Sequence, residues 1–154
     1  MNRKYTRQLF LETVERLKKH DPDFTFTTDI IVGFPGETEA DFHDTLNVMR
    51  DVKFAKVHMF PYSERKRTLA ALYPNKVPQE VIQKRKQIVL HEAEQQAFTL
   101  RQNFVGRTMK VLTENDGSGH TENFLNVIVS HEPNQIVTVF CESNAPEGLI
   151  GRVI

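Results

Sequence analysis

The stretch TDIIVGFPG at residues 28–36 joins a short apolar segment to a tight break, and it decides the local fold. β-Branched and aromatic residues from Phe24 to Val32 predict a buried strand, which Gly33-Phe34-Pro35-Gly36 ends. Thr38 is then the predicted N-cap of a helix over about residues 39–52, whose first turn carries acidic residues at its positive end. The stretch therefore predicts a strand–turn–helix unit.

The residues around this unit continue the alternation of helix and strand. Residues 5–19 predict an amphipathic helix, residues 55–60 a second strand, and residues 79–104 a long helix after the aperiodic segment 61–78. Such alternation implies parallel strands with crossover helices. Two strands can neither close a barrel nor bury both faces of a sheet, and a full (β/α) barrel takes about 250 residues. The region is therefore expected to be the rear part of a larger barrel.

The pattern changes to an alternation of period two in the last third of the chain. Predicted strands cover residues 108–114, 122–130, 135–142 and 149–154, with turns at 116–119 and 132–134. Four short strands in about 50 residues predict a small antiparallel barrel, a fold that often binds single-stranded nucleic acid. The predicted domains are therefore residues 1–102 and residues 103–154.

Composition narrows the chemistry that the chain can perform by itself. The chain has 154 residues, of which 39% are hydrophobic and 26% charged, as in folded globular proteins. Its lone cysteine, Cys141, excludes an internal disulfide and any cysteine-built zinc or iron–sulfur site within the chain, and it favours a reducing, cytoplasmic setting. Residues 1–102 carry 17 Lys and Arg against 14 Asp and Glu, or +3, whereas residues 103–154 carry 3 against 6, or −3. A strongly basic nucleic-acid binder would show more positive charge than this.

Four segments resemble, in the right order, the radical SAM methylthiotransferases. TDIIVGFPGET at 28–38, followed by Asp41-Phe42, resembles their signature strand, and HMFPYSER at 58–65 resembles the next barrel strand and its loop. PNKVP at 74–78 is similar to their approach to the last long helix. GHTENF at 119–124 resembles the motif of their TRAM domain, an RNA-binding β-barrel, in the form typical of the threonylcarbamoyladenosine tRNA methylthiotransferase branch. The resemblance covers nearly the whole chain.

The resemblance implies an α/β fold, a partial (β/α) radical SAM barrel over residues 1–102 followed by a small antiparallel, OB-like TRAM barrel over residues 103–154. It implies addition of a methylthio group to C2 of N6-threonylcarbamoyladenosine at tRNA position 37. The cofactors would be S-adenosylmethionine and [4Fe-4S] clusters whose cysteine ligands lie upstream in the family. The implied partners are tRNA and the missing N-terminal part of the same enzyme, in the cytoplasm, and the electron donor stays open. This chain is not expected to catalyse the reaction alone.

The resemblance also assigns site residues at the carboxyl ends of the two predicted barrel strands, where barrel enzymes bind ligands. The expected contacts to S-adenosylmethionine are Ile31, Gly33, Gly36, Glu37, Phe60, Tyr62 and Ser63. Residue chemistry leaves alternatives open. Gly33 and Gly36 either let a planar ligand approach the backbone or only permit the turn. Phe60 either contacts the cofactor or belongs to the core, and Tyr62 either contacts the cofactor or anchors the loop. Asp29, in a buried strand, is expected to pair with an arginine of the missing half or to hydrogen-bond locally.

RNA contact is expected in the second region. Its candidate residues are Arg107, Lys110, His120, Asn123 and Phe124. An aromatic ring beside hydrogen-bonding groups can stack on a base, although Phe124 in the core is the alternative and the negative charge of the region opposes phosphate binding. Of the two basic runs, Arg65-Lys66-Arg67 is expected to be solvated or to meet RNA phosphate. Lys84-Arg85-Lys86 is expected to be a solvated face, with domain docking or tRNA contact as the alternative.

The loop after Tyr62-Ser63 departs from the family. Residues 64–71 read ERKRTLAA where family members usually carry prolines and a glycine, so the loop is expected to be less pre-set and more basic. Two other functions remain open: a truncated, non-catalytic RNA-binding module, and part of a methylthiotransferase that acts on a ribosomal protein. The motif at residues 119–124 argues against the latter.

Overall fold

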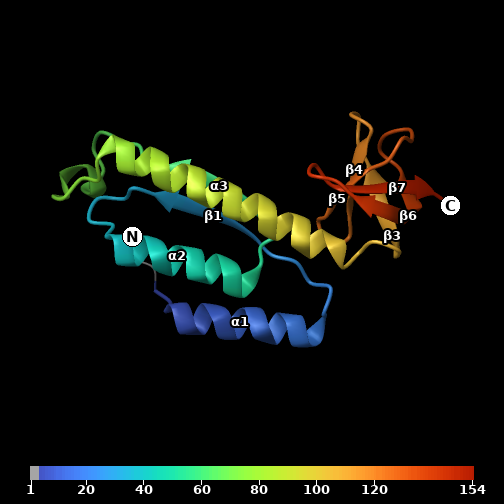
Figure 1. Ribbon diagram of the computed structural model, residues 1–154, viewed down its shortest axis with the longest axis horizontal. Helices are drawn as coiled ribbons and strands as arrows, with labels where there is room; N and C mark the ends of the chain where they lie inside the picture. The colour runs from blue at the N-terminus through green and yellow to red at the C-terminus, as the bar shows by residue number, and fades with distance from the viewer. Residues whose placement is uncertain (1–3) are drawn as a thin grey trace. The chain divides into compact units, whose positions relative to one another are not determined.

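The computed structural model describes residues 4–154, which form two compact units. The first unit comprises the residues up to Glu15 and Phe26–Ala93, and the second comprises Arg16–Thr25 and Glu94–Ile154. The helices and strands before the barrel are α1 (Arg7–His20), β1 (Thr27–Val32), α2 (Glu39–Val52), β2 (Lys56–Pro61), the 3-10 helix η1 (Leu69–Leu72) and α3 (Gln79–Gln102), shown in Figure 1. No helix within residues 4–154 combines the length and the apolar character that a membrane crossing requires.

In the first unit three helices pack on one face of a two-stranded parallel sheet. β1 pairs with β2 in register from Thr27 with Lys56 to Val32 with Pro61, and α2 makes the crossover between them. The core joins Ile30 and Val32 of β1 to buried side chains of all three helices: Val14, Phe42, Leu46, Met49, Val52, Ile82 and Val89. These apolar residues recur every three to four positions along α2, which confirms its predicted buried stripe. The predicted helices and strands of this region are confirmed to within a few residues at their ends.

Helix α2 begins with a complete capping box. Thr38 accepts a hydrogen bond from the Asp41 amide at 3.1 Å, and the Thr38 amide donates to the Asp41 carboxylate at 2.9 Å. The Thr38 hydroxyl also donates to that carboxylate at 2.6 Å, and these hydrogen bonds lower the pKa of the Asp41 carboxyl below its ordinary value. The predicted N-cap is therefore confirmed, and it places the start of α2 directly after the turn that ends β1.

The opposite face of the β1–β2 pair is open. Ile31 and Phe60, which are register partners, are 38% and 50% exposed, and their neighbours Asp29 and His58 are exposed as well. Asp29 is exposed rather than buried within residues 4–154, and its pairing with an arginine of the missing half stays a prediction. Parallel sheets are usually covered on both faces, so this unit has the one-sided packing expected for part of a larger sheet.

The second unit contains a closed five-stranded barrel. Its strands are β3 (Thr108–Thr113), β4 (Ser118–Thr121), β5 (Asn126–Ile128), β6 (Ile136–Asn144) and β7 (Leu149–Val153), in the order β3-β4-β5-β7-β6. All pairs are antiparallel except β5 with β7, which is parallel. Val111, Val127, Val139, Cys141 and Leu149 are fully buried inside it. The predicted fold class, a partial α/β region followed by a small barrel, is confirmed.

One strand of the barrel was predicted wrongly. The expected strand 122–130 is interrupted, because the Phe124 amide donates to the Thr121 carbonyl at 2.9 Å and forms a turn between β4 and β5. β4 instead begins at Ser118, inside the segment predicted as a turn. Gly119 lies within that strand, where a Cβ would come 2.5 Å from the Leu112 carbonyl oxygen. This glycine therefore permits a close approach of two strands rather than a turn.

The end of α3 is anchored to the barrel within the second unit. Arg101, only 8% exposed, donates to the Asn144 side chain at 3.1 Å and to the carbonyl oxygens of Ala145 and Pro146 at 3.0 and 2.9 Å. The compact unit thus includes the last turns of α3 as well as the strands. The functional domain division at residues 102 and 103 stays a prediction.

The one-sided sheet predicts that two phenylalanines contribute very differently to stability. Phe42→Ala should cost about 3–5 kcal/mol of unfolding free energy, because Phe42 is 1% exposed in the core. Phe60→Ala should cost less than about 1 kcal/mol, because half of the Phe60 side chain is already in solvent. Urea unfolding followed by circular dichroism measures both, and apolar-dye binding should fall only in Phe60→Ala. Equal losses of stability would show that the open face is covered in solution.

Candidate functional site

The carboxyl ends of β1 and β2 form one edge, where the predicted cofactor residues gather. The Gly33–Glu37 turn follows β1, and Tyr62 follows β2, with the Tyr62 amide donating to the Val32 carbonyl at 2.8 Å. Ile31 and Phe60 lie on the open face beside this edge, and Ser63 is exposed. The alternative that Phe60 is a core residue is therefore wrong. Parallel sheets bind ligands at such carboxyl ends.

The two glycines of the turn have different structural reasons. Gly33 has a φ of 79°, and a Cβ there would come 2.7 Å from Cδ1 of Ile82 on α3. Gly36 has a φ of 86° but no atom within 4 Å of a Cβ, and its amide donates to the Asn75 carbonyl at 2.9 Å. The positive φ of the turn explains why glycine occurs at both positions. At Gly33 the close packing of α3 is a second reason, because a Cβ would overlap Ile82. A direct cofactor contact at Gly33 and Gly36 stays a prediction.

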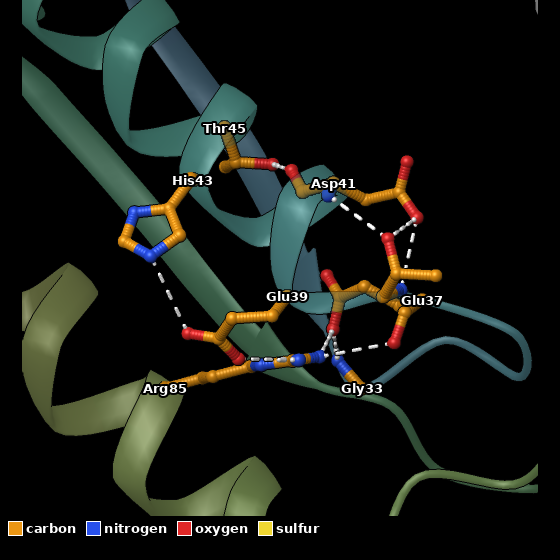
Figure 2. Close-up of polar contacts among 8 residues, drawn as sticks. Gly33, Glu37, Glu39, Asp41, His43, Thr45 and Arg85 are labelled. Atoms are coloured by element: carbon orange, nitrogen blue, oxygen red, sulfur yellow. Dashed lines mark hydrogen bonds and ion pairs between the residues drawn. The ribbon is translucent and has the colours of Figure 1, made fainter.

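Glu37 is engaged inside the protein (Figure 2). Its Oε2 accepts a hydrogen bond from the Gly33 amide at 2.6 Å and from Nη1 of Arg85 at 2.6 Å. The same Nη1 also donates to the Glu37 backbone carbonyl at 3.3 Å. The Glu37 side chain is 10% exposed. The structure thus brings the predicted residues Gly33 and Glu37 together, and it adds an arginine from α3.

Arg85 corrects a sequence-based expectation. The run Lys84-Arg85-Lys86 was expected to be a solvated face, but Arg85 is 5% exposed. Its guanidinium donates to Glu39 at 3.0 Å, a hydrogen bond that lowers the pKa of the Glu39 carboxyl, and it lies 5.1 Å from the centre of the Phe42 ring. Position 85 lies three residues after Ile82 and four before Val89, both buried, so the helical period itself indicated that position 85 points inward.

An aromatic cluster supports the same edge of the sheet. The Phe34 ring meets Tyr62 edge-on at 5.4 Å between centroids and Tyr73 at 6.1 Å. The Tyr62 side chain is thus packed as a loop anchor, one of the two alternatives for this residue. Its hydroxyl is buried and has no hydrogen-bond partner among residues 4–154, a costly state for a polar group.

The edge fits part of an adenosine-containing ligand but does not fit an iron–sulfur cluster. Ile31 and Phe60 offer exposed apolar surface to a purine ring. Cys141 is the only cysteine of the chain; it is buried in the barrel, and burial raises the pKa of its thiol. Among residues 4–154 no three His, Cys, Asp or Glu side chains are grouped to hold a metal.

On the barrel, Phe124 projects into solvent. Its side chain is 73% exposed and its φ is 63°, a left-handed conformation that is rare for a bulky residue. The alternative that Phe124 belongs to the core is therefore wrong. His120 lies 6.5 Å away between ring centroids, and its Nδ1 is 3.2 Å from the Glu114 carboxylate. Leu112, 50% exposed, is the register partner of His120 and extends this surface across β3.

Two predicted RNA contacts are occupied within the second unit. Arg107 binds both carboxylate oxygens of Asp23 at 2.8 and 2.7 Å. Asn123 donates to the Asp23 carbonyl at 2.9 Å, accepts from the Thr121 hydroxyl at 2.6 Å, and its carbonyl oxygen accepts from the Thr25 hydroxyl. These side chains hold the segment before β1 to the barrel. Contacts across 84 to 100 residues leave no local sequence signal, so the sequence could not indicate them.

Lys110 and His120 keep surface positions on the barrel. Lys110 is exposed on β3, and His120 is partly exposed on the neighbouring strand β4. Their contact with RNA, like that of Arg107, Asn123 and Phe124, stays a prediction.

Known proteins match the chain from end to end, although no family model does. The threonylcarbamoyladenosine tRNA methylthiotransferase of Chlamydia pneumoniae is 40% identical over 100% of this chain and 38% of its own length. The tRNA-2-methylthio-N(6)-dimethylallyladenosine synthase of Caldicellulosiruptor saccharolyticus is 45% identical over 92% of the chain and 29% of its own length. The protein of that name from Rickettsia typhi is 35% identical over 100% of the chain and 37% of its own length.

The relatives match both the two-stranded α/β unit and the small closed barrel of this chain. The chain belongs to the methylthiotransferase family, as its motifs indicated. It spans between 29% and 38% of the length of these three relatives.

The two glycines of the turn predict unequal responses to one added methyl group. Gly36→Ala should lower the unfolding free energy by about 1–2 kcal/mol, the cost of a positive φ in a residue with a Cβ. Gly33→Ala should add about 1–3 kcal/mol to that cost, because its Cβ overlaps Ile82. Denaturant titrations of both variants measure the difference, and in an Ile82→Ala background, compared with Ile82→Ala alone, Gly33→Ala should cost no more than Gly36→Ala. Equal losses at the two glycines would contradict the overlap.

Proposed function

We propose that this chain forms the part of a tRNA methylthiotransferase that supplies one wall of the S-adenosylmethionine site and an RNA-binding barrel. The observation that carries the proposal is the one-sided sheet, whose open face presents Ile31 and Phe60 beside the carboxyl ends of β1 and β2. Identity to methylthiotransferases across the whole chain supports it. The missing N-terminal part of the enzyme would continue this sheet and provide the cysteines for [4Fe-4S] clusters.

The residues of the chain have distinct proposed tasks at the cofactor site. S-adenosylmethionine supplies, with the clusters of the complete enzyme, the radical chemistry by which an aromatic carbon is modified. Ile31 and Phe60 pack against its purine and exclude water from it. Tyr62 packs edge-on against Phe34 and supports the edge beside the site. Gly33, Gly36 and Glu37 shape the turn that borders the site.

The proposed reaction adds a methylthio group to C2 of N6-threonylcarbamoyladenosine at tRNA position 37, in the cytoplasm. The GHTENF motif and the end-to-end match to the Chlamydia pneumoniae enzyme of that name support this substrate. N6-dimethylallyladenosine is the second candidate, which the 45% identity to the Caldicellulosiruptor saccharolyticus enzyme favours.

The barrel is proposed to hold the tRNA through an exposed aromatic surface. Phe124 is solvent-exposed and backed by His120, so a base unstacked from the RNA can stack on it. Lys110, exposed on β3, offers a positive charge to a nearby phosphate.

Nucleoside analysis tests the proposed reaction. The coding sequence, together with any in-frame sequence that precedes it, is expressed in bacteria that lack their own tRNA methylthiotransferases, and tRNA nucleosides are measured by mass spectrometry. The 2-methylthio derivative of threonylcarbamoyladenosine is the expected product. The 2-methylthio derivative of dimethylallyladenosine would replace the proposed substrate with the second one. Unmodified tRNA with retained tRNA binding would favour the non-catalytic RNA-binding module.

Removing the Phe124 ring should weaken RNA binding without unfolding the barrel. Phe124→Ala in the complete enzyme is expected to lower tRNA affinity about 5- to 150-fold, the loss of one stacked base worth about 1–3 kcal/mol. Fluorescence anisotropy with labelled tRNA measures this loss. The control is Ile150→Ala on β7, which neighbours neither β3 nor β4 in the barrel. Equal tRNA affinities of Phe124→Ala and Ile150→Ala would show that Phe124 does not contact the tRNA.

A further inference from the structure

Arg85 has a structural position that the proposed function leaves unexplained. A buried guanidinium is costly unless it is paired and hydrogen-bonded. Its two terminal nitrogens meet two carboxylates, Glu37 at 2.6 Å and Glu39 at 3.0 Å, on either side of the helix N-cap (Figure 2). The Arg85 side chain is 6% exposed, whereas Glu39 is largely in solvent, so the pair with Glu37 is the buried one.

The buried pair connects α3 to the end of β1 through a single oxygen atom. Oε2 of Glu37 accepts from the Arg85 guanidinium and from the Gly33 amide, both at 2.6 Å. Nη1 of Arg85 also reaches the Glu37 carbonyl, so side chain and backbone of Glu37 are held together. The Glu37 carboxylate therefore closes the turn by accepting from the Gly33 amide, and Arg85 holds both that carboxylate and the Glu37 carbonyl.

We infer that Arg85 is a positioning residue for the S-adenosylmethionine site, acting through Glu37 on the Gly33–Glu37 turn; this inference rests on the proposed function. Glu37 is 10% exposed and one of its carboxylate oxygens already has two donors, so Glu37 acts by shaping the turn rather than by touching the cofactor. The turn borders Ile31, and a shift of the turn moves the wall that packs on the purine. Arginine suits this task because its planar fork bonds to two carboxylates, which a lysine ammonium does not do with the same geometry.

The structure offers a matched control on the same two helices. Arg50 of α2 binds Glu92 of α3 through two hydrogen bonds, at 3.1 and 3.0 Å. This pair joins α2 to α3 as the pair of Arg85 with Glu39 does, but Arg50 lies near the C-terminal end of α2, whereas the Gly33–Glu37 turn precedes its N-terminal end. Arg50 and Arg85 therefore both link α2 to α3, but only Arg85 also contacts the Gly33–Glu37 turn. An effect on the turn that is seen with Arg85 variants and not with Arg50→Met is due to positioning of the turn.

The test compares Arg85→Met, Arg85→Lys and Arg50→Met by two measurements. Amide hydrogen exchange in the 154-residue chain reports on residues 33–38. In the complete enzyme, KM for S-adenosylmethionine and kcat are measured at saturating tRNA. Arg85→Met should speed exchange at the turn and raise KM about 10- to 100-fold, the usual loss when a group that orients a binding residue is removed, with a smaller change in kcat. Arg85→Lys should lie between Arg85→Met and the wild type, and Arg50→Met should match the wild type.

Each contrary outcome has a separate meaning. Equal effects of Arg85→Met and Arg50→Met, or an unchanged KM in Arg85→Met, would overturn the positioning role and leave the proposed function intact. A wild-type enzyme that does not bind S-adenosylmethionine would overturn the proposed function, and the inference with it. If Arg85→Met does not fold, Glu37→Gln gives the same test, because the amide oxygen keeps the Gly33 bond while the charge that holds Arg85 is lost. Wild-type exchange and KM in Glu37→Gln would then overturn the inference.

Discussion

One carboxylate oxygen of Glu37 holds together the part of the chain on which the cofactor edge depends. It accepts from the Gly33 amide, where β1 ends, and from Arg85, which belongs to α3. Two carboxylates and one aromatic ring offset part of the desolvation cost of Arg85, whose buried Nε has no hydrogen-bond partner among residues 4–154. The end of β1, the start of α2 and the second turn of α3 thus share one anchor.

The open face has a physical consequence for the function of the chain. A parallel sheet buried on one side leaves 38% of Ile31 and 50% of Phe60 exposed, and this exposed area gains nothing from the hydrophobic effect. The same two side chains lie next to the strand ends that parallel sheets use for ligands. The exposed apolar face of the β1–β2 sheet is unfavourable in this chain by itself. It would become useful if a further segment of chain and a ligand covered it, because it would then form one wall of a binding site. The relatives are more than twice as long as their match to this chain.

Local signals in the sequence predicted most of the fold and only part of the site. Thr38 and the apolar stripe of α2 act within a few residues of each other, so the helix and its cap were predictable. Gly119 looks like a turn residue, yet it serves the contact with β3, so the start of β4 was missed. The spacing of Arg85 from the buried residues Ile82 and Val89 indicated that it is buried, but its lysine neighbours suggested a solvated face instead. No local sequence pattern indicated the ion pair of Arg107 with Asp23, because the two residues lie 84 positions apart in the sequence.

The charges of the barrel determine how it can bind RNA under the proposal. Arg107 pairs with Asp23 and Arg152 with Glu142, so two of the three cations in residues 103–154 are already neutralised. Lys110 has no ion pair within residues 4–154, and one such contact contributes little of the counterion release that drives phosphate binding. Stacking does not need a positive surface, since every base has a π-face. The strained backbone of Phe124 keeps a ring in solvent at the cost of stability, as expected for a residue retained for binding rather than for folding.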